Sequence, residues 1–300
     1  MISRRSGAKR EVRTFALVAS CLVVSCPTTL HAEVVRWIRF EDPDAAGQAT
    51  FGKLMGDVVH AVAGVPWESP QETGRTLPTG DLRPLIPTEP NHVLGGAYNF
   101  RSHLQGRSPP AEPQFFWKSP SSLAPHNAPI ELPHDARNAH YEAELVIVLG
   151  RAVRHATLAQ AERAIFGYTC GNDVSERTWQ ESDVQWWRAK STATFGPVGP
   201  VIATGVDWRD LRIRGVHNGQ VVQDESASDL LFSPAEMVQY ASRYVDLQPG
   251  DLIFTGSPGN TQPLRSGDVF EVHIEPIGVL RNRVEQPTQA AGRLPAALAR

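Results

Sequence analysis

The feature that most constrains this 300-residue chain is an unbroken apolar run, residues 145–149, that directly follows two glutamates and ends at Gly150. A short run of β-branched and aliphatic residues closed by a glycine predicts a buried strand. Successive side chains on a strand point to opposite faces, so Glu142 and Glu144 face the same way. Two carboxylates on one face repel each other and resist burial unless a cation neutralises them.

A third carboxylate, Asp173, lies further along in the segment 167–177. Three carboxylate oxygens without a neighbouring cysteine or histidine suit a hard divalent ion, Mg²⁺, Mn²⁺ or Ca²⁺. Taken alone, the pair Glu142 and Glu144 also fits the wet face of a sheet. Other residues must decide between a metal site and a solvated strand.

The charge balance favours a small-molecule ligand. A net charge of -3 is near neutrality, which favours neither nucleic acid nor an anionic membrane as a partner. Aromatic and basic residues do not interleave as they do in proteins that bind single strands. We therefore expect no nucleic-acid partner.

Residues 1–32 have the layout of a secretory signal peptide. A basic start precedes an apolar run, 15–25, which Pro27 ends, and a small residue, Ala32, stands before Glu33 at a plausible cleavage point. The run is too short to span a bilayer. The basic residues are Arg4, Arg5, Lys9 and Arg10. This layout predicts an exported protein, periplasmic or secreted.

Other interpretations of the first residues remain open. Residues 23–26 resemble a bacterial lipobox. In that case Cys26 would be acylated, and the lipoprotein would be tethered to the membrane. Arg4 and Arg5 could form a twin-arginine signal, although the following residues lack its usual apolar side chain. A misassigned start codon would leave the protein in the cytoplasm. After cleavage Cys170 is the remaining cysteine, and we expect a buried packing thiol there.

The rest of the chain predicts a mainly β (α+β) protein. Residues 33–90 form a small β-rich N-terminal domain and linker, 91–284 a larger, mostly antiparallel domain with short helices, and 285–300 a loose tail. A helix is expected at 158–166 and another at 233–242, with Ser233 as N-cap and Pro234 at the first helical position. Asn218-Gly219 predicts a type I′ hairpin. The expected strands are 142–149, 198–204, 211–216, 221–223, 252–255 and 269–274.

The motifs from residue 94 to residue 284 resemble, in order and spacing, the fumarylacetoacetate hydrolase family. The segments that carry the likeness are 142–145, 167–180, 188–200, 218–223, 249–258 and 264–280. The resemblance implies a mixed β-roll or barrel-like catalytic domain, a homodimer, and Mg²⁺ or Mn²⁺ held by Glu142, Glu144 and Asp173. It also implies 2-oxo or 2,4-dioxo acids as substrates.

The same resemblance assigns further site residues. Lys190 takes the position of a family lysine near the metal, where an ammonium steadies an oxyanion or donates a proton. Arg177 and Gln180, three apart on a short helical turn, could grip a substrate carboxylate. Ser257, in a Gly-Ser-Pro turn, offers a hydroxyl to the same carboxylate.

One departure from the family pattern concerns the candidate base His103. Hydrolytic members carry a glutamate three residues after this histidine, and the pair activates water; here that position is Gly106. An imidazole without an acidic partner is a poorer base, because nothing in the sequence fixes its tautomer. Glu112 could substitute from elsewhere on the loop.

These residues favour a metal-dependent hydrolase that cleaves a C–C bond in a 2,4-dioxo acid through a metal-stabilised enolate. Two alternatives use the same pocket. One is an oxaloacetate-type decarboxylase or a keto–enol isomerase, which needs no activated water. The other is a catalytically silent protein that binds oxo acids.

Overall fold

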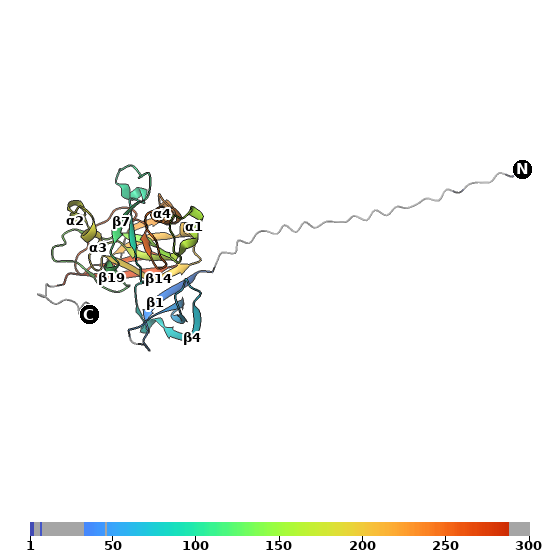
Figure 1. Cartoon of the computed structure of the whole chain (residues 1–300), viewed down its shortest axis with the longest axis horizontal. Coiled ribbons are helices and arrows are strands. Elements are labelled where there is room, and N and C mark those ends of the chain that lie inside the picture. The colour runs from blue at the N-terminus through green and yellow to red at the C-terminus, as the bar shows by residue number, and fades with distance from the viewer. Residues whose placement is uncertain (3–6, 8–32, 46, 288–300) are drawn as a thin grey trace. The chain divides into compact units, whose positions relative to one another are not determined.

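The structure is a computed structural model that describes residues 1–2, 7, 33–45 and 47–287 (Figure 1). The predicted signal peptide, with Cys26, lies outside the described residues except for residues 1, 2 and 7, and so does the predicted tail beyond residue 287. No helix in the described ranges is long and apolar enough to cross a membrane.

A large, mainly antiparallel sheet of twelve strands forms the centre of the described part of the chain. Its strands are β1 (Val35–Glu41), β2 (Ala49–Met55), β3 (Val58–Ala63), β4 (Gln71–Pro78), β5 (Arg83–Pro84), β6 (Val93–Ala97), β7 (Gln114–Lys118), β8 (Leu123–Ala124), β11 (Ala143–Leu149), β12 (Ile165–Asn172), β14 (Gly196–Thr204) and β17 (Leu252–Phe254). The main order is β4-β3-β2-β1-β14-β12-β11-β17-β6-β7, with β5 beside β1 and β8 beside β14. β1 pairs with β14, so the N-terminal strands continue the sheet that carries β11.

A second sheet and a short pair complete the strands of the described residues. The second sheet has the order β16-β15-β18-β19-β9, and β10 pairs with β13. Their bounds are β9 (Ile130–Glu131), β10 (Ala139–His140), β13 (Ser175–Glu176), β15 (Arg212–His217), β16 (Gln220–Ser226), β18 (Val269–Ile274) and β19 (Gly278–Glu285). Asn218 and Gly219 have φ of 51° and 80°, so the predicted type I′ turn between β15 and β16 is confirmed.

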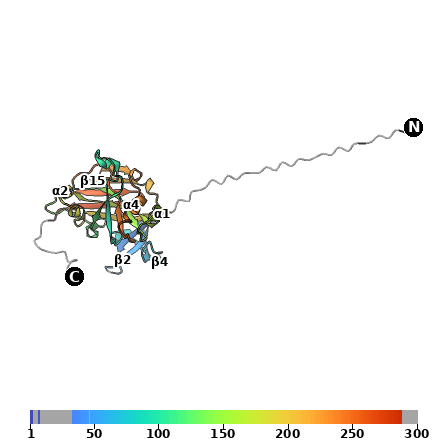
Figure 2. The ribbon, with the colours of Figure 1, turned by 45° about the horizontal axis from the view of Figure 1, so that its top comes forward.

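The helices of the described ranges are short. They are α1 (Leu158–Ala164), α2 (Arg177–Ser182), α3 (Trp187–Ser191) and α4 (Pro234–Ala241). Ser233 caps α4 in a capping box and Pro234 stands in its first turn, as predicted. The helix expected at 158–166 ends at Ala164, because Ile165 and Phe166 belong to β12, where Ile165 pairs with Leu149 of β11. β15 and α4 can be followed in the turned view of Figure 2.

Strand β11 is buried along its whole length, which explains its unbroken apolar sequence. Leu145, Ile147 and Leu149 belong to one apolar cluster and Val146 and Val148 to another, so both faces of the strand are covered. The mainly β fold class is confirmed. The described residues beyond 32 form one compact unit, and the domain boundary near residue 90 stays a prediction.

Candidate active site

The three predicted metal ligands come together at one end of the β11–β12 pair. Ala143 pairs with Asn172, and the Asp173 backbone N–H donates to the Glu142 carbonyl oxygen at 2.9 Å. This register places Asp173 beside Glu142 and Glu144, and one carboxylate oxygen from each lies within 4.8 Å of the other two. All three side chains are buried, so the cluster is not the wet face of a sheet.

Glu142 is surrounded by donors. Its Oε2 accepts hydrogen bonds from the Lys190 ammonium at 2.6 Å and the Ser175 hydroxyl at 3.0 Å, and its Oε1 accepts one from Arg177 at 2.6 Å. Burial alone raises the pKa of a carboxyl, but Lys190 and Arg177 hold the pKa of Glu142 well below its usual value. Glu142 is therefore ionised.

Asp173 has two lysine partners, one of which the sequence did not single out as a site residue. Its Oδ2 accepts from Lys190 at 2.5 Å, and its Oδ1 accepts from Lys118 at 2.6 Å. Lys118 is fully buried at the end of β7 and also donates to the carbonyl oxygens of Phe195, at 3.0 Å, and Lys190. A signal was available, because residues 116–118, Phe-Trp-Lys, resemble a Phe-x-Lys segment of the family that the sequence resembles.

Lys190 is the predicted catalytic lysine, and it lies between two of the carboxylates from the short helix α3. Burial lowers the pKa of its ammonium, but Asp173 and Glu142 outweigh burial and leave the pKa above its usual value. For Lys118 burial prevails, and its pKa is lowered. The two lysines also differ in location. Lys190 lines the cavity of the site, whereas Lys118 does not.

Glu144 differs from its two neighbours, because no residue in the described ranges forms an ion pair with it. Its Oε2 accepts one hydrogen bond, from the Gly256 backbone N–H at 2.7 Å. Burial, followed by the charges of Asp173 and Glu142, raises its pKa well above the usual value. A buried carboxylate of this kind beside two others matches the all-oxygen ligand set of a hard divalent cation.

The structure corrects the expectation that nothing fixes the tautomer of His103. Its Nδ1 lies 2.7 Å from the carbonyl oxygen of Gly259, which can only accept a hydrogen bond. In the neutral ring the proton is therefore on Nδ1, and Nε2 carries the lone pair. Nε2 faces the site, 3.6 Å from Glu142 Oε1. A backbone carbonyl thus orients His103, a task that the family resemblance would assign to a glutamate at position 106.

The proposed substitute for that glutamate lies elsewhere. Glu112 is exposed, its side chain hydrogen-bonds to Tyr240, and it is not among the residues that line the cavity. Gly106 has φ of 85° and follows Gln105 at φ 50°, so the glycine serves the left-handed turn after the 3₁₀ segment Arg101–Leu104. In the described part of the chain His103 has no acidic partner besides Glu142.

Arg177 and Gln180 lie on α2 and point into the site, as predicted. Arg177 Nη1 donates to the Gln180 side-chain oxygen at 2.8 Å, and Nη2 donates to Thr261 at 3.0 Å and to Glu142. Thr261 in turn lies 2.9 Å from Nδ1 of His140. Burial, then the charge of Arg177, lowers the pKa of His140 to about 4, so this ring is neutral. Thr261 and His140 were not predicted: His140 lies on β10, two residues before Glu142, and Thr261 lies in the loop between β17 and β18.

Ser257 also reaches the site, and Gln223 holds it there. The Gln223 amide donates to the Ser257 hydroxyl at 2.8 Å and accepts from the Ala143 backbone N–H at 3.0 Å. Gln223 belongs to a family motif, but its position in the sequence did not indicate this supporting contact. Its hydrogen bonds link the serine to the first residue of β11.

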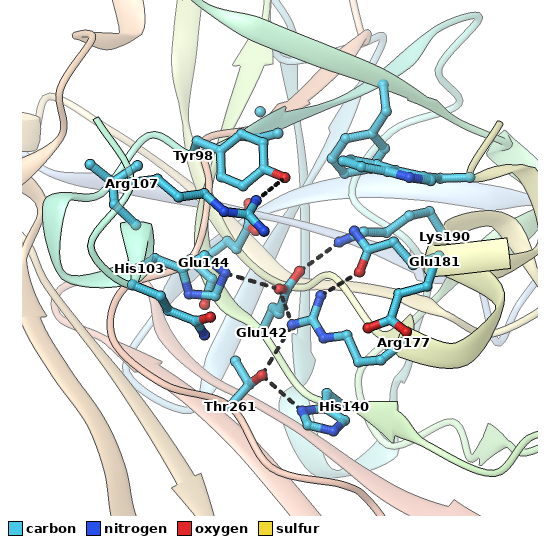
Figure 3. A pocket seen from close by; sticks show the side chains of 18 of the residues that line it. Tyr98, His103, Arg107, His140, Glu142, Glu144, Arg177, Glu181, Lys190 and Thr261 are labelled. Carbon is cyan, nitrogen blue, oxygen red and sulfur yellow. Dashed lines mark hydrogen bonds and ion pairs between the residues drawn. The ribbon is translucent and has the colours of Figure 1, made fainter. Parts of the chain in front are cut away.

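A cavity of about 430 Å³ opens onto these groups. Among the residues that line it, Tyr98 and Arg107 lie on one side of Glu142 and Arg177 lies on the other (Figure 3). Tyr98 and Arg107 were not predicted from the sequence. The lining also includes the predicted residues His103, Glu142, Glu144, Arg177, Gln180, Lys190 and Ser257. Buried carboxylates, three cationic side chains (Arg107, Arg177 and Lys190) and an oriented imidazole around one cavity are typical of an enzyme site for small anions.

Comparison with known proteins identifies the family. Residues 92–285 match the family described as fumarylacetoacetate (FAA) hydrolase C-terminal, and residues 35–87 match the Rv2993c-like N-terminal family. The chain belongs to the fumarylacetoacetate hydrolase family, a family of enzymes that act on small oxo acids.

Individual relatives carry different names. "Protein Rv2993c" of Mycobacterium tuberculosis is 40% identical over 82% of this chain and 96% of its own length. The 2,4-didehydro-3-deoxy-L-rhamnonate hydrolase of a Sphingomonas strain is 32% identical over 68% of this chain and 79% of its own. The structure of 2-hydroxyhepta-2,4-diene-1,7-dioate isomerase from Mycobacterium marinum, 37% identical, superposes with a TM-score of 0.79 over 85% of this chain and all of the other.

Proposed function

We propose that this protein is a divalent-metal-dependent enzyme that interconverts the keto and enol forms of a 2-oxo acid. The observation that carries the proposal is the buried trio of Glu142, Glu144 and Asp173, whose member Glu144 has no cationic partner in the described ranges and faces a cavity shared with Nε2 of His103. The related isomerase from M. marinum supports this choice of reaction.

The donor set fits Mg²⁺ or Mn²⁺, because it offers three carboxylates and neither thiolate nor imidazole nitrogen to soften it. A cation held there would supply Lewis acidity toward the carbonyl oxygen of the substrate, where negative charge develops. Lys118 holds Asp173 and Ser175 holds Glu142, so the ligands are oriented in advance by hydrogen bonds.

The protein's own side chains then have distinct tasks. His103, with its lone pair on Nε2, is placed to remove a proton from C3 and to return it there in the reverse direction. Lys190 contributes a buried positive charge that stabilises the oxygen of the enolate, and its ammonium is the group that donates a proton to this oxygen to give the enol and recovers it in the reverse direction. Arg177, Gln180 and Ser257 offer hydrogen-bond donors to the substrate carboxylate.

Keto–enol interconversion fits the site better than hydrolysis because it needs one base and no activated water. The backbone carbonyl of Gly259 orients His103 but carries no negative charge, so it stabilises the imidazolium less than a carboxylate does. A base that only removes a proton from C3 and returns it has less need of a carboxylate partner.

Hydrolysis of a C–C bond in a 2,4-dioxo acid is the second candidate. It is favoured by the fixed tautomer of His103, which leaves Nε2 able to accept a proton from water as well as from carbon. The related Sphingomonas hydrolase supports this reading. Decarboxylation of an oxaloacetate-type acid uses the same enolate and would appear in the same assays, whereas a silent oxo-acid-binding protein would bind without turnover.

Purified protein tests the proposal directly. The enol form of oxaloacetate is followed by its ultraviolet absorbance, with and without Mg²⁺ and Mn²⁺, and corrected for the rate with metal alone. We expect metal-dependent acceleration that EDTA removes. Acetate and pyruvate released from acetylpyruvate would instead identify the hydrolase, and pyruvate formed from oxaloacetate the decarboxylase. No metal-dependent turnover of any 2-oxo acid would exclude all three reactions.

Two further proposals concern the whole protein. The family resemblance leads us to propose a homodimer, which light scattering of the purified protein tests. The layout of residues 1–32 leads us to propose export, with a lipid anchor at Cys26 as the variant form. Fractionation of cells that express the full chain and a Cys26→Ala variant separates a secreted, a tethered and a cytoplasmic protein.

A further inference from the structure

We propose that Arg107, held in place by Tyr98, binds a second carboxylate at the far end of the substrate, so that the enzyme selects 2-oxo diacids over 2-oxo monoacids. This inference rests on the proposed function, which places the first carboxylate and the keto oxygen at the Glu142, Glu144 and Asp173 end of the cavity. It adds a specificity-determining residue to that site.

The backbone around Arg107 adopts unusual conformations that direct its side chain to the cavity. Gln105 and Gly106 follow one another with φ of 50° and 85°, and the Arg107 N–H donates back to the Leu104 carbonyl oxygen at 2.9 Å. Tyr98, directly after β6, has φ of 58°. An aromatic residue in the left-handed region is strained, and such strain persists where the surrounding structure holds it, often at functional sites.

Two contacts fix the guanidinium against the Tyr98 ring. Arg107 Nη1 donates to the phenol oxygen at 2.8 Å, and the guanidinium carbon lies 5.3 Å from the ring centroid. This double contact orients a side chain that would otherwise be mobile at its exposed position. Orienting the arginine before the substrate arrives lowers the entropic cost of binding.

The charge of Arg107 is not neutralised by protein groups. Within the described ranges no carboxylate forms an ion pair with it, whereas the cavity's other arginine, Arg177, is paired with Glu142. Both line the cavity, and they lie on opposite sides of Glu142 (Figure 3). Arginine presents a planar fork of N–H donors that matches a carboxylate, so an uncompensated one at this place suits an anionic group of the ligand.

An exposed carboxylate that lines the cavity indicates the direction of the second carboxylate of the substrate. Glu181, on α2, lines the cavity on the Arg177 side and would repel an anion there (Figure 3). On the Arg107 side the carboxylate among the described lining residues is Glu144, a proposed metal ligand whose charge a bound cation would balance (Figure 3). At position 106, where hydrolytic relatives carry a glutamate, glycine permits the turn and adds no negative charge. The departure that removes a partner of His103 thus also leaves room for an anion beside Arg107.

A matched pair of four-carbon acids tests the proposal with the Mg²⁺-loaded full-length protein. Oxaloacetate and 2-oxobutanoate differ by a carboxylate in place of a methyl group at C4. We measure kcat and KM for oxaloacetate and the competitive inhibition constant of 2-oxobutanoate, which reports binding whether or not that acid is turned over. The variants are Arg107→Gln, Arg107→Lys, Tyr98→Phe and the control Arg101→Gln, which removes an exposed charge of the same loop that does not line the cavity.

We expect Arg107→Gln to raise the KM for oxaloacetate roughly tenfold while kcat and the inhibition constant of 2-oxobutanoate stay within about twofold. Arg107→Lys should restore part of the loss, Tyr98→Phe should cause a smaller one, and Arg101→Gln should resemble wild type. Equal effects of Arg107→Gln on both acids, or none on either, would overturn the inference.

The outcome separates this inference from the proposed function. Turnover of oxaloacetate by wild type with no preference lost in Arg107→Gln refutes the diacid site alone. Absence of metal-dependent turnover refutes the proposed function, and calorimetric dissociation constants of the same two acids then decide the diacid site. In that measurement, a wild-type preference for oxaloacetate that Arg107→Gln abolishes supports the site, and equal affinities reject it.

Discussion

Two clusters of charged residues, one in the N-terminal strands and one at the end of β11, differ in how many hydrogen bonds and ion pairs their buried carboxylates receive. Asp42 accepts four hydrogen bonds: two from the Arg75 guanidinium at 2.8 and 3.0 Å, one from the Asp44 backbone N–H and one from the Thr50 hydroxyl. Glu144, equally hidden from solvent, accepts one hydrogen bond from a backbone N–H and has no ion pair in the described residues.

The difference shows how to separate structural from functional charge. The donors around Asp42, Arg75 first, hold its pKa far below the usual value, so its ionised form stabilises the fold. The ionised form of Glu144 is opposed by burial and by Asp173 and Glu142, so it costs stability unless a cation binds. The first cluster is complete without a ligand, and the second needs one.

The largest expected effect is that of Glu144→Gln on turnover. Removing one of three carboxylate ligands should lower the metal-dependent rate by roughly a thousandfold. In metal-free buffer the same change should leave the thermal midpoint unchanged or raise it, because a neutral amide replaces an uncompensated carboxylate. The matched change Asp42→Asn should do the reverse, with full activity and a lower midpoint. Full activity in Glu144→Gln would contradict the metal assignment.

Lys118→Met should cause the largest loss of stability. The ammonium is fully buried and bonds to Asp173 and two carbonyl oxygens, so its removal leaves buried acceptors unpaired, at a cost of about 3–5 kcal/mol. Urea unfolding measures this difference. Lys53→Met, which removes the half-buried partner of the exposed Glu72 in the N-terminal strands, is the control and should change little. Equal effects of the two changes would mean that the site is not preorganised by Lys118.

Metal binding should raise the free energy of unfolding through the cluster at Glu144 and should not depend on the cluster at Asp42. Adding Mg²⁺ or Mn²⁺ at about 100 times the dissociation constant should add roughly 2.7 kcal/mol to wild type and to Asp42→Asn. Glu144→Gln should gain much less at the same concentration. Calorimetry of unfolding, with EDTA as the reference condition, checks the shift. A stabilisation in Glu144→Gln as large as in wild type would place the ion elsewhere.

The smallest expected effect is on pH-dependent stability in the N-terminal strands. Arg75 lowers the pKa of Asp42 in the folded state below the unfolded value of 3.8. The stabilisation is therefore fully present above that value and is lost as pH falls below it toward the folded pKa. The advantage of wild type over Asp42→Asn in urea midpoint should shrink between about pH 6 and about pH 3. A constant difference would show that Asp42 is not ionised by this pair.

The sequence predicted the parts of the fold that depend on local patterns. The bounds of β18 and the caps of α4 follow from alternation and from Ser233-Pro234, and Glu142 and Glu144 share a face because a strand has a period of two. Ile165 and Phe166 were assigned to a helix but lie in β12. The pairing of Ile165 with Leu149 of β11 is a long-range contact that local periodicity does not reveal.

The site was predictable to the same extent. Its three carboxylates, together with Lys190, Arg177 and the other predicted side chains, lie in motifs that the sequence displays. The contacts that decide the chemistry are not visible in the sequence: the carbonyl of Gly259, itself at φ 61°, contacts His103, and the Tyr98–Arg107 pair follows the turn at Gln105 and Gly106. Such turns bring together loops whose arrangement depends on the whole fold.

The most direct test of the central claim is the exchange of hydrogen for deuterium at C3 of oxaloacetate, followed by proton NMR in D₂O with Mg²⁺. We predict that the enzyme with Mg²⁺ exchanges this hydrogen faster than Mg²⁺ alone does. Both EDTA and the Glu144→Gln change should abolish the acceleration by the enzyme, since both remove the cation from the buried carboxylates. Exchange at the background rate in Mg²⁺-loaded wild type would contradict enolate formation at this site.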